Sequence, residues 1–235
     1  MKTKILGDVH GGFKGMMQCF ERSKFDYKKD RLIVLGDVCD GWPETKQCID
    51  ELLKVKNLVY LLGNHDKWAY EWAIRGDKPE IWVYQGGSAT LESYDYKGMP
   101  ESHIKLLRSA PWYFEENNKL FVHAGLTDPE KPMKEQRLND LIWDRELLEM
   151  AWHAQFCSEV KKVSIWDEIF LGHTTTRCYK DRLNRVINTP IHVCEVWDLD
   201  TGGGWGGKIT IMDLDTKEYW QSDFVKYLYP NYKGR

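Results

Sequence analysis

The sequence predicts an α/β fold in a single domain that spans residues 1–235. Three short apolar runs rich in β-branched residues lie in the first part of the chain, and each precedes a polar loop and a helix-like stretch. Their similar spacing favours parallel pairing through right-handed crossovers. With 42% apolar and 29% charged residues, the composition is that of an ordinary globular protein, and the chain is long enough to bury a substantial core.

The first three strands are each expected to end in a polar loop. Residues 3–7 form the first strand, and apolar residues at i, i+3, i+4 and i+7 from Phe13 predict the helix that follows. The run RLIVL at 31–35 is the second strand, and its helix has Pro43 in the first turn. The stretch NLVYLLGNHDKW (57–68) contains the third strand, which ends in a third polar loop.

The middle of the chain changes character. Residues 66–110 are expected to be mostly helical, with breaks at GDKPE (76–80) and GG (86–87). This aromatic-rich segment is either a cap beside the functional site or a helical layer over the sheet, and the sequence leaves both open. The stretch WYFEENNKLFVHAG (112–125) predicts a hairpin that turns at two asparagines.

The last part of the chain is predicted to be a helix followed by short strands. The helix covers 134–156, and a strand in DEIFLGHTTT (167–176) follows it. The glycine-rich TGGGWGG (201–207) is interpreted as a wide turn between antiparallel strands, because no G-K-[ST] follows to make a phosphate loop. The final residues YPNYKGR (229–235) are expected to be a mobile tail.

Charge and cysteine usage exclude several classes of protein. A net charge of −3 argues against a strongly basic surface, so stable nucleic-acid binding is not expected. The six cysteines contain no C-x-x-C pair, which argues against zinc-ribbon and thioredoxin-type sites, and reduced thiols suit a cytoplasmic location. The chain enters a strand at once and lacks a long apolar run, so no membrane association is expected. The oligomeric state stays open.

Metal-ligand side chains follow the predicted strands at the end where open α/β sheets bind ligands. They are Asp8, His10, Asp37, Asp40, Asn64, His65, His123 and His173. Such oxygen and imidazole ligands suit divalent ions such as Mn²⁺, Fe²⁺ or Zn²⁺. Asp8 and His10 can reach one ion, the Asp37 carboxylate can bridge two ions, and the second ion would be completed by Asn64, His123 and His173. Two such ions about 4 Å apart can activate water and hold both oxygens of a phosphoryl displacement.

Each motif alone is a weak signal, but five of them in order, each after a strand, form a strong joint one. The ordered set is GDVHG (7–11), GDVCD (36–40), GNHD (63–66), HAG (123–125) and GH (172–173). It resembles the calcineurin-like metallophosphoesterases, especially the small bacterial and bacteriophage members of the phosphoprotein phosphatase branch. IWDR (142–145) and the stretch 199–216 add to the resemblance.

The resemblance implies a four-layer α/β/β/α sandwich with mixed sheets and a dinuclear centre. The two divalent ions would be Mn²⁺ foremost, with Fe, Zn, Ni or Mg as alternatives. It assigns one ion to Asp8, His10 and Asp37, and the other to Asp37, Asn64, His123 and His173. In the same way, it implies that His65 protonates the leaving group, that Asp40 orients His65, and that Asn64 and Arg145 bind the phosphate.

Chemistry and sequence agree on one of these roles and depart on another. A departing alkoxide needs a proton, and the carboxylate of Asp40 is expected to keep the imidazole of His65 protonated near neutral pH. The family usually reads GDxxDRG, but Gly41 and Trp42 follow Asp40 here. The missing arginine would weaken the binding of a monoester dianion, which gains most from a bidentate guanidinium.

Three functions are consistent with these residues. The first is a metal-dependent phosphatase that hydrolyses phosphomonoesters, with phosphoserine or phosphothreonine in proteins as the substrate. The alternative is a nucleotide or nucleic-acid phosphoesterase acting on dinucleoside polyphosphates, polynucleotide ends or phosphodiesters. Gly41 favours it, because a diester carries one charge fewer. The third, a non-enzymatic scaffold, predicts a lost metal ligand, and none is missing from the sequence.

Overall fold

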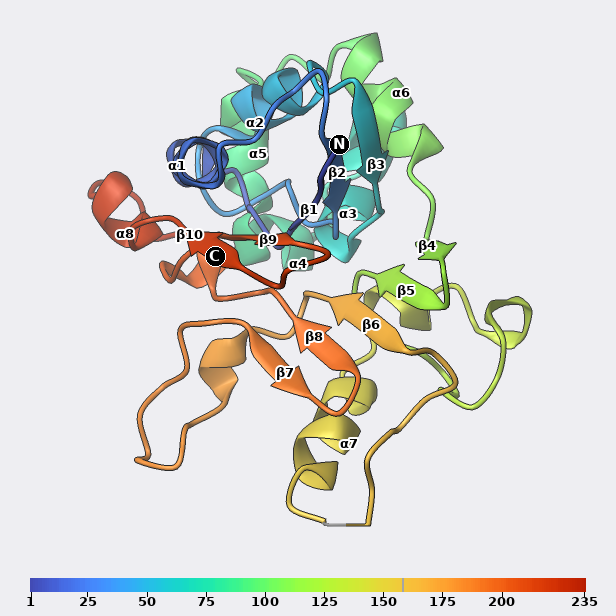
Figure 1. Ribbon diagram of the computed structural model, residues 1–235. Helices are drawn as coiled ribbons and strands as arrows, with labels where there is room; N and C mark the ends of the chain where they lie inside the picture. The colour runs from blue at the N-terminus through green and yellow to red at the C-terminus, as the bar shows by residue number, and fades with distance from the viewer. Residues whose placement is uncertain (158) are drawn as a thin grey trace.

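Two five-stranded sheets lie face to face in the computed structural model, which describes residues 1–157 and 159–235 (Figure 1). The first sheet has the order β10-β9-β1-β2-β3, and its strands are β1 (Thr3–Leu6), β2 (Arg31–Val34), β3 (Asn57–Tyr60), β9 (Thr210–Asp213) and β10 (Tyr219–Gln221). The second sheet has the order β4-β5-β6-β8-β7, and its strands are β4 (Tyr113–Glu116), β5 (Lys119–Val122), β6 (Glu168–Leu171), β7 (Ile191–Val193) and β8 (Val196–Asp198). Both sheets are mixed, as predicted.

Parallel pairing brings the polar loops of the first sheet to one edge. Strand β1 pairs with β2 and β2 with β3 in parallel, so that Leu6, Val34 and Tyr60 lie side by side. The chain leaves all three strands at the same end. It continues into the helices α1 (Phe13–Ser23), α2 (Thr45–Leu52) and α3 (Asn64–Arg75).

The second sheet brings two further loops to the same region. The hairpin β4–β5 turns at Asn117 and Asn118, whose φ angles of 52° and 56° suit the left-handed turn that asparagine tolerates. Strand β6 pairs in parallel with β5 and with β8. The residues directly after β5 and β6, which include His123 and His173, therefore lie at one edge.

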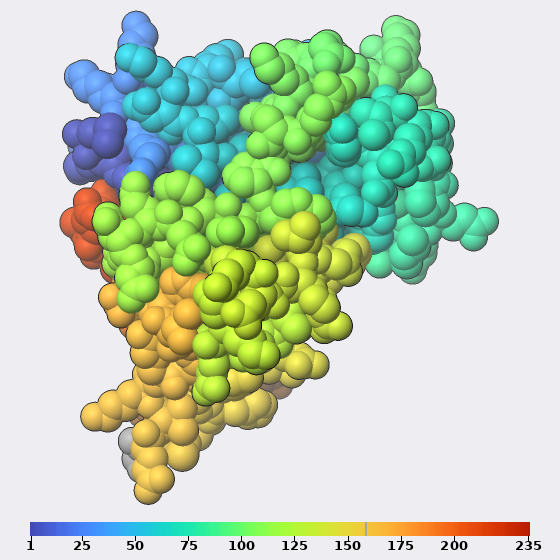
Figure 2. Space-filling view, turned by 90° about the vertical axis from the view of Figure 1, so that its right-hand side faces the viewer, coloured from blue at the N-terminus to red at the C-terminus, as the bar shows by residue number. Residues whose placement is uncertain are grey.

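The core lies in three layers. Nine buried residues fill the space between the sheets, and among them the rings of Phe121 and Phe170 stack with centroids 5.0 Å apart. Helices α1, α2 and α3 and residues from 82–107 cover the outer face of the first sheet. Helix α7 (Glu146–Ala154) covers the second sheet, whose half of the molecule tapers in Figure 2. The four-layer sandwich predicted from the resemblance is confirmed.

The remaining helical segments are short. They are α4 (Glu80–Trp82), the π-turn η1 (Val83–Gly87), α5 (Ser88–Ser93), α6 (Glu101–Ser109), η2 (Met133–Glu135), η3 (Asp140–Ile142), η4 (Thr176–Cys178), η5 (Gly203–Trp205) and α8 (Val225–Leu228). The helical segment after α3 has breaks where they were expected, since Gly76 and Gly86 have φ angles of 78° and 103°. Its role as a cap stays a prediction. No helix in the described ranges is long and apolar enough to cross a membrane.

Three local predictions are wrong. The helix expected over 134–156 begins only at Glu146, after two short 3-10 segments at 133–135 and 140–142, and the Asp144 carboxylate accepts a hydrogen bond from the Leu147 amide in its first turn. The glycine-rich stretch 201–207 connects β8 and β9, which belong to different sheets, so it is a crossing between sheets and not a hairpin turn. The expected mobile tail is packed: Tyr229 is buried and stacks on Trp42.

Candidate metal centre

Two groups of buried ligand side chains share one carboxylate. Asp8, His10 and Asp37 form the first group, and Asp37, His123 and His173 form the second. In each group the ligand atoms lie within 4.8 Å of one another. Because the ligands follow β1, β2, β5 and β6, both sheets contribute to the centre, and Asp37 lies where their edges meet.

The first group directs the Nε2 of His10 toward two carboxylates. The Nδ1 of His10 lies 3.1 Å from the carbonyl oxygen of Cys39, which fixes the proton on Nδ1. Its Nε2 therefore presents a lone pair, 3.7 Å from oxygens of both Asp8 and Asp37. An imidazole lone pair gathered with two carboxylates in this way is an arrangement that a cation stabilises.

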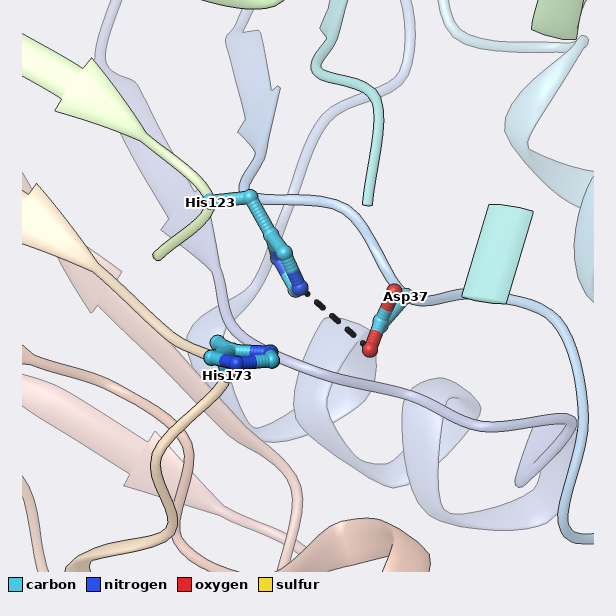
Figure 3. Close-up of side chains that lie close together, drawn as sticks. All are labelled: Asp37, His123 and His173. Atoms are coloured by element: carbon cyan, nitrogen blue, oxygen red, sulfur yellow. Dashed lines mark ion pairs between the residues drawn. The ribbon is translucent and has the colours of Figure 1, made fainter. Parts of the chain in front are cut away.

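The second group is built in the same way (Figure 3). His123 donates from Nδ1 to the carbonyl oxygen of Leu35 over 2.8 Å, and its Nε2 lies 3.3 Å from Asp37 Oδ2. The Asn64 Oδ1 lies 3.1 Å from that nitrogen and 3.0 Å from Nδ1 of His173. Asn64 thus places a neutral oxygen between the two histidines.

The bridging carboxylate itself fits a metal centre. Asp37 Oδ1 accepts from the His65 amide over 2.9 Å, whereas Oδ2 is buried and has no hydrogen-bond partner among the described residues. A buried charged oxygen without a donor is costly unless a cation neutralises it. The backbone is strained at the same places, because His10, Asp37 and His173 have φ angles of 50°, 49° and 66°. The described residues therefore fit two divalent ions joined by Asp37.

The pKa values of the ligands reflect burial and mutual charge. Burial opposes ionisation of Asp37, but the imidazole of His123 holds its pKa well below the usual range. Burial likewise acts to lower the pKa of His123, yet the Asp37 carboxylate outweighs it and raises that pKa to about 9. Burial raises the pKa of Asp8 to about 7. Without ions, the raised pKa values of Asp8 and His123 favour bound protons. Divalent ions would supply the positive charge in place of these protons.

A histidine and an aspartate lie beside the ligands. His65 Nδ1 is 2.6 Å from Asp40 Oδ2, and the His65 ring meets that of His10 edge-on at 5.0 Å. Asp40 also accepts from Trp82 Nε1 over 2.8 Å and from Thr90 Oγ1 over 2.7 Å. The Nε2 of His65 is buried and has no partner in the part of the chain that the structure describes.

Burial opposes the protonation expected for this pair. Burial lowers the pKa of His65 to about 3 and raises that of Asp40 to about 7. Burial is the largest influence on the pKa of His65, and protonation of this ring through its pairing with Asp40 stays a prediction. A further negative charge near Nε2 would favour protonation of the ring.

Arg145 and the amide of Asn64 lie at the second ligand group. Arg145 is exposed directly before α7, and its Nη1 donates to Thr174 Oγ1 over 3.0 Å, next to His173. The Asn64 Nδ2 is buried and lacks a hydrogen-bond partner within the described ranges. Both groups are donors that an anion beside the second ligand group could use.

Several residues at the site escaped the sequence analysis. Asp66 accepts from the amides of Val38, Cys39 and Gly63 at 3.0, 3.0 and 3.2 Å, and so fixes the loop that carries Asp37. Its place in GNHD was the only signal. Trp82 and Thr90 lie 42 and 50 residues from Asp40, and no local pattern indicates their contact with it.

Comparison with known proteins agrees with this geometry. The calcineurin-like phosphoesterase family model matches residues 1–194. Serine/threonine-protein phosphatase 1 of Salmonella typhimurium is 25% identical over 213 residues, covering 88% of this chain and 89% of the relative. The symmetrical bis(5'-nucleosyl)-tetraphosphatase of Pseudomonas fluorescens is 25% identical over 270 residues, covering 93% of each.

A solved structure shares the fold as well. A metallophosphoesterase from Sphaerobacter thermophilus has a TM-score of 0.57 at 17% identity, covering 95% of this chain and 89% of that one. Members of the matching family use divalent metal ions, and the two ligand groups here are of the required kind. The chain therefore belongs to the calcineurin-like phosphoesterase family and is a metal-dependent phosphoric ester hydrolase.

Proposed function

We propose that the protein is a dinuclear metal-dependent phosphatase that hydrolyses phosphomonoesters, with phosphoserine or phosphothreonine in proteins as its substrate. One arrangement carries the proposal: the two buried ligand groups share Asp37, and beside them lies the Nε2 of His65, which has no hydrogen-bond partner among the described residues. The serine/threonine-protein phosphatase among the relatives supports this substrate class.

The chain's own residues would have distinct roles. Asp8, His10 and Asp37 would hold one ion, and Asp37, Asn64, His123 and His173 the other. Mn²⁺ is the ion proposed first, and Fe, Zn, Ni or Mg are the alternatives. When bound, the ions would activate water and neutralise the phosphoryl oxygens.

The remaining residues would act on the substrate. Arg145 and Asn64 would bind phosphoryl oxygens through N–H donors. His65 would become protonated beside the phosphate dianion and donate from Nε2 to the leaving oxygen. Asp40, held by Trp82 and Thr90, would keep that ring in place. The expected cytoplasmic location and the absence of stable nucleic-acid binding stay predictions.

Elemental analysis and a pair of model substrates test the proposal. The purified protein should contain two divalent ions per chain and prefer p-nitrophenyl phosphate over bis(p-nitrophenyl) phosphate. Asp37→Asn should lose metal and activity while its circular dichroism stays unchanged. The exposed Asp223→Asn is the control. A marked preference for the diester, or activity that survives Asp37→Asn, would contradict the proposal.

A nucleotide substrate is the second candidate, and two tryptophans favour it. The ring of Trp68 meets those of His65 and Trp143 at 5.2 and 5.1 Å, and Trp143 is 37% exposed. Such aromatic faces stack nucleobases. The tetraphosphatase relative supports this candidate too. If it is correct, Trp143→Leu should raise KM for diadenosine tetraphosphate and leave that for a phosphopeptide unchanged.

A further inference from the structure

The last residues of the sequence return to the metal centre. We call residues 229–235 the strap. Its Tyr229 stacks on Trp42 with ring centroids 5.3 Å apart, and Tyr232 donates to Glu92 over 3.1 Å. At its end the Arg235 amide donates to the carbonyl oxygen of Gly204 over 2.9 Å, which fixes this end beside η5.

Trp42 forms the floor on which the strap lies. Its side chain is fully buried and donates from Nε1 to the carbonyl oxygen of Gly203 over 2.8 Å. A Cβ on Gly234 would come within 2.9 Å of the Trp42 ring, so the strap crosses the ring at close range. Trp42 stands where the GDxxDRG pattern has a glycine.

Three glycines make room for the side chain of Arg235. A Cβ added to Gly41, Gly86 or Gly204 would lie 3.4, 3.3 and 2.9 Å from its aliphatic carbons. These glycines come from three distant parts of the chain, and Gly41 and Gly86 are joined by a backbone hydrogen bond of 3.0 Å. We call the space between these three glycines the channel, and a side chain at any of the three positions would narrow it.

The guanidinium of Arg235 ends at the first ligand group. Its Nη1 lies 3.1 Å from His10 Nε2, and its plane lies over the Trp205 ring at 5.1 Å. Its Nε is buried without a hydrogen-bond partner among the described residues. A metal ion in the first group would bind the lone pair of His10 Nε2. The guanidinium of Arg235 would then lose this acceptor while its N–H donors still face the site.

We propose that Arg235 supplies the phosphate-binding guanidinium that position 41 lacks, so that the strap completes the substrate site. The inference rests on the proposed phosphomonoesterase function. A positive charge beside two cations is stable only with an anion between them, and a phosphate dianion provides one. The glycine at position 41 then admits an arginine from elsewhere, and it no longer favours a diester.

Phosphate binding by the Mn²⁺-loaded protein tests the role directly. Isothermal titration with inorganic phosphate should give a Kd about 10- to 100-fold higher for Arg235→Ala than for wild type, the effect of losing hydrogen bonds to a charged group. Arg235→Gln should show a similar loss, since it removes the charge but keeps much of the stem in the channel. Lys233→Ala, an exposed change in the same strap, should bind phosphate as wild type does.

A second titration distinguishes phosphate binding by Arg235 from the alternative that Arg235 blocks the site of the first ion. Mn²⁺ should bind the metal-free Arg235→Ala variant about as tightly as it binds wild type. If the variant instead binds Mn²⁺ far more tightly and phosphate as before, Arg235 blocks the first ion and the inference is wrong. Wild-type phosphate affinity in Arg235→Gln would also overturn it.

Substrate preference gives an independent check. Arg235→Ala should lower kcat/KM for p-nitrophenyl phosphate more than for bis(p-nitrophenyl) phosphate, because the dianion loses more than the monoanion. Equal losses would contradict the inference. If the wild-type protein hydrolyses neither ester, the proposed function fails, while the phosphate titration still decides the role of Arg235.

Discussion

His65 combines a buried position with one nitrogen that has no partner within the described ranges. Asp40 fixes its Nδ1 at 2.6 Å, which leaves Nε2 as the only nitrogen able to exchange a proton with a substrate. Burial lowers the pKa of His65 to about 3, so the ring by itself is neutral near pH 7. If His65 is the acid, as proposed, a phosphate dianion beside Nε2 would raise that pKa again, and protonation of the ring would depend on the arrival of the substrate.

This role predicts a dependence on the leaving group. His65→Asn should lower kcat for phenyl phosphate by about 10²- to 10⁴-fold, the usual contribution of a general acid. The loss for p-nitrophenyl phosphate should be much smaller, because its phenolate leaves without a proton. Steady-state rates with both esters measure the difference. His153→Asn, an exposed change on α7, is the control, and equal losses for the two esters would exclude His65 as the acid.

At the scale of elements, the helical segment after α3 holds the aspartate that orients His65. Its Trp82 lies against Trp72 of α3 and Gly87 of η1, and the indole N–H reaches Asp40 Oδ2 at 2.8 Å. Trp82→Phe keeps most of the packing and removes this donor. We expect kcat to fall about tenfold, the effect of one hydrogen bond to a charged group.

Metal content should not change in Trp82→Phe, because the indole N–H donates to Asp40, which belongs to neither ligand group. Rates and elemental analysis on the same preparation check both expectations. The matched control is Tyr84→Phe, which removes a polar group that is 88% exposed on the same segment. A loss of metal in Trp82→Phe would indicate a structural role instead.

The junction of α2, α5 and α6 carries a pH-sensitive contact. His103 is buried, with Nδ1 2.8 Å from the Tyr94 hydroxyl and Nε2 3.0 Å from Asp50. Burial lowers the pKa of His103 below its ordinary value of 6.5. As the pH falls through 6.5, the unfolded chain takes up this proton before the folded one, so stability is lost below that pH.

His103→Gln cannot titrate and should therefore flatten the decrease of Tm between about pH 7 and pH 5. Thermal unfolding followed by circular dichroism at several pH values measures the slope. The exposed His153→Gln should leave the slope as in wild type. An unchanged slope in His103→Gln would mean that His103 is equally protonated in the folded and unfolded chains.

The sequence predicts site residues that are close together in the chain, and it does not predict contacts between residues far apart in the chain. Asp8 and His10 lie on one loop directly after a strand, so a local pattern together with parallel pairing is enough to place them. The contacts of Asp40 with Trp82 and Thr90 and that of His10 with Arg235 span 42, 50 and 225 residues. Hydrophobic periodicity indicates only local structure, so it cannot predict contacts between residues so far apart in the sequence.

At the scale of the whole molecule, the metal centre joins the two sheets. Asp8 and Asp37 follow strands of the first sheet, and His123 and His173 follow strands of the second. Ions bound between them stabilise the folded state by mass action. We expect EDTA to lower Tm. The decrease should be several degrees if the Kd of the ions lies well below their free concentration before EDTA is added.

The same titration on a variant provides the control. Asp37→Asn removes the shared ligand, so its Tm should start lower and no longer respond to EDTA. Differential scanning calorimetry with and without added Mn²⁺ measures both proteins. An equal response of the two proteins to EDTA would show that the chelator acts elsewhere.

The return of β9 to the first sheet has a consequence for synthesis of the protein. Strand β1 lies between β2 and β9, and β9 is about two hundred residues further along the chain, with the whole second sheet between them. While the chain is being made, β1 keeps an unpaired edge that other chains can bind. The nascent protein is therefore vulnerable to aggregation until nearly all of it has left the ribosome. A chaperone that covers this edge would matter more for its yield than for its final stability.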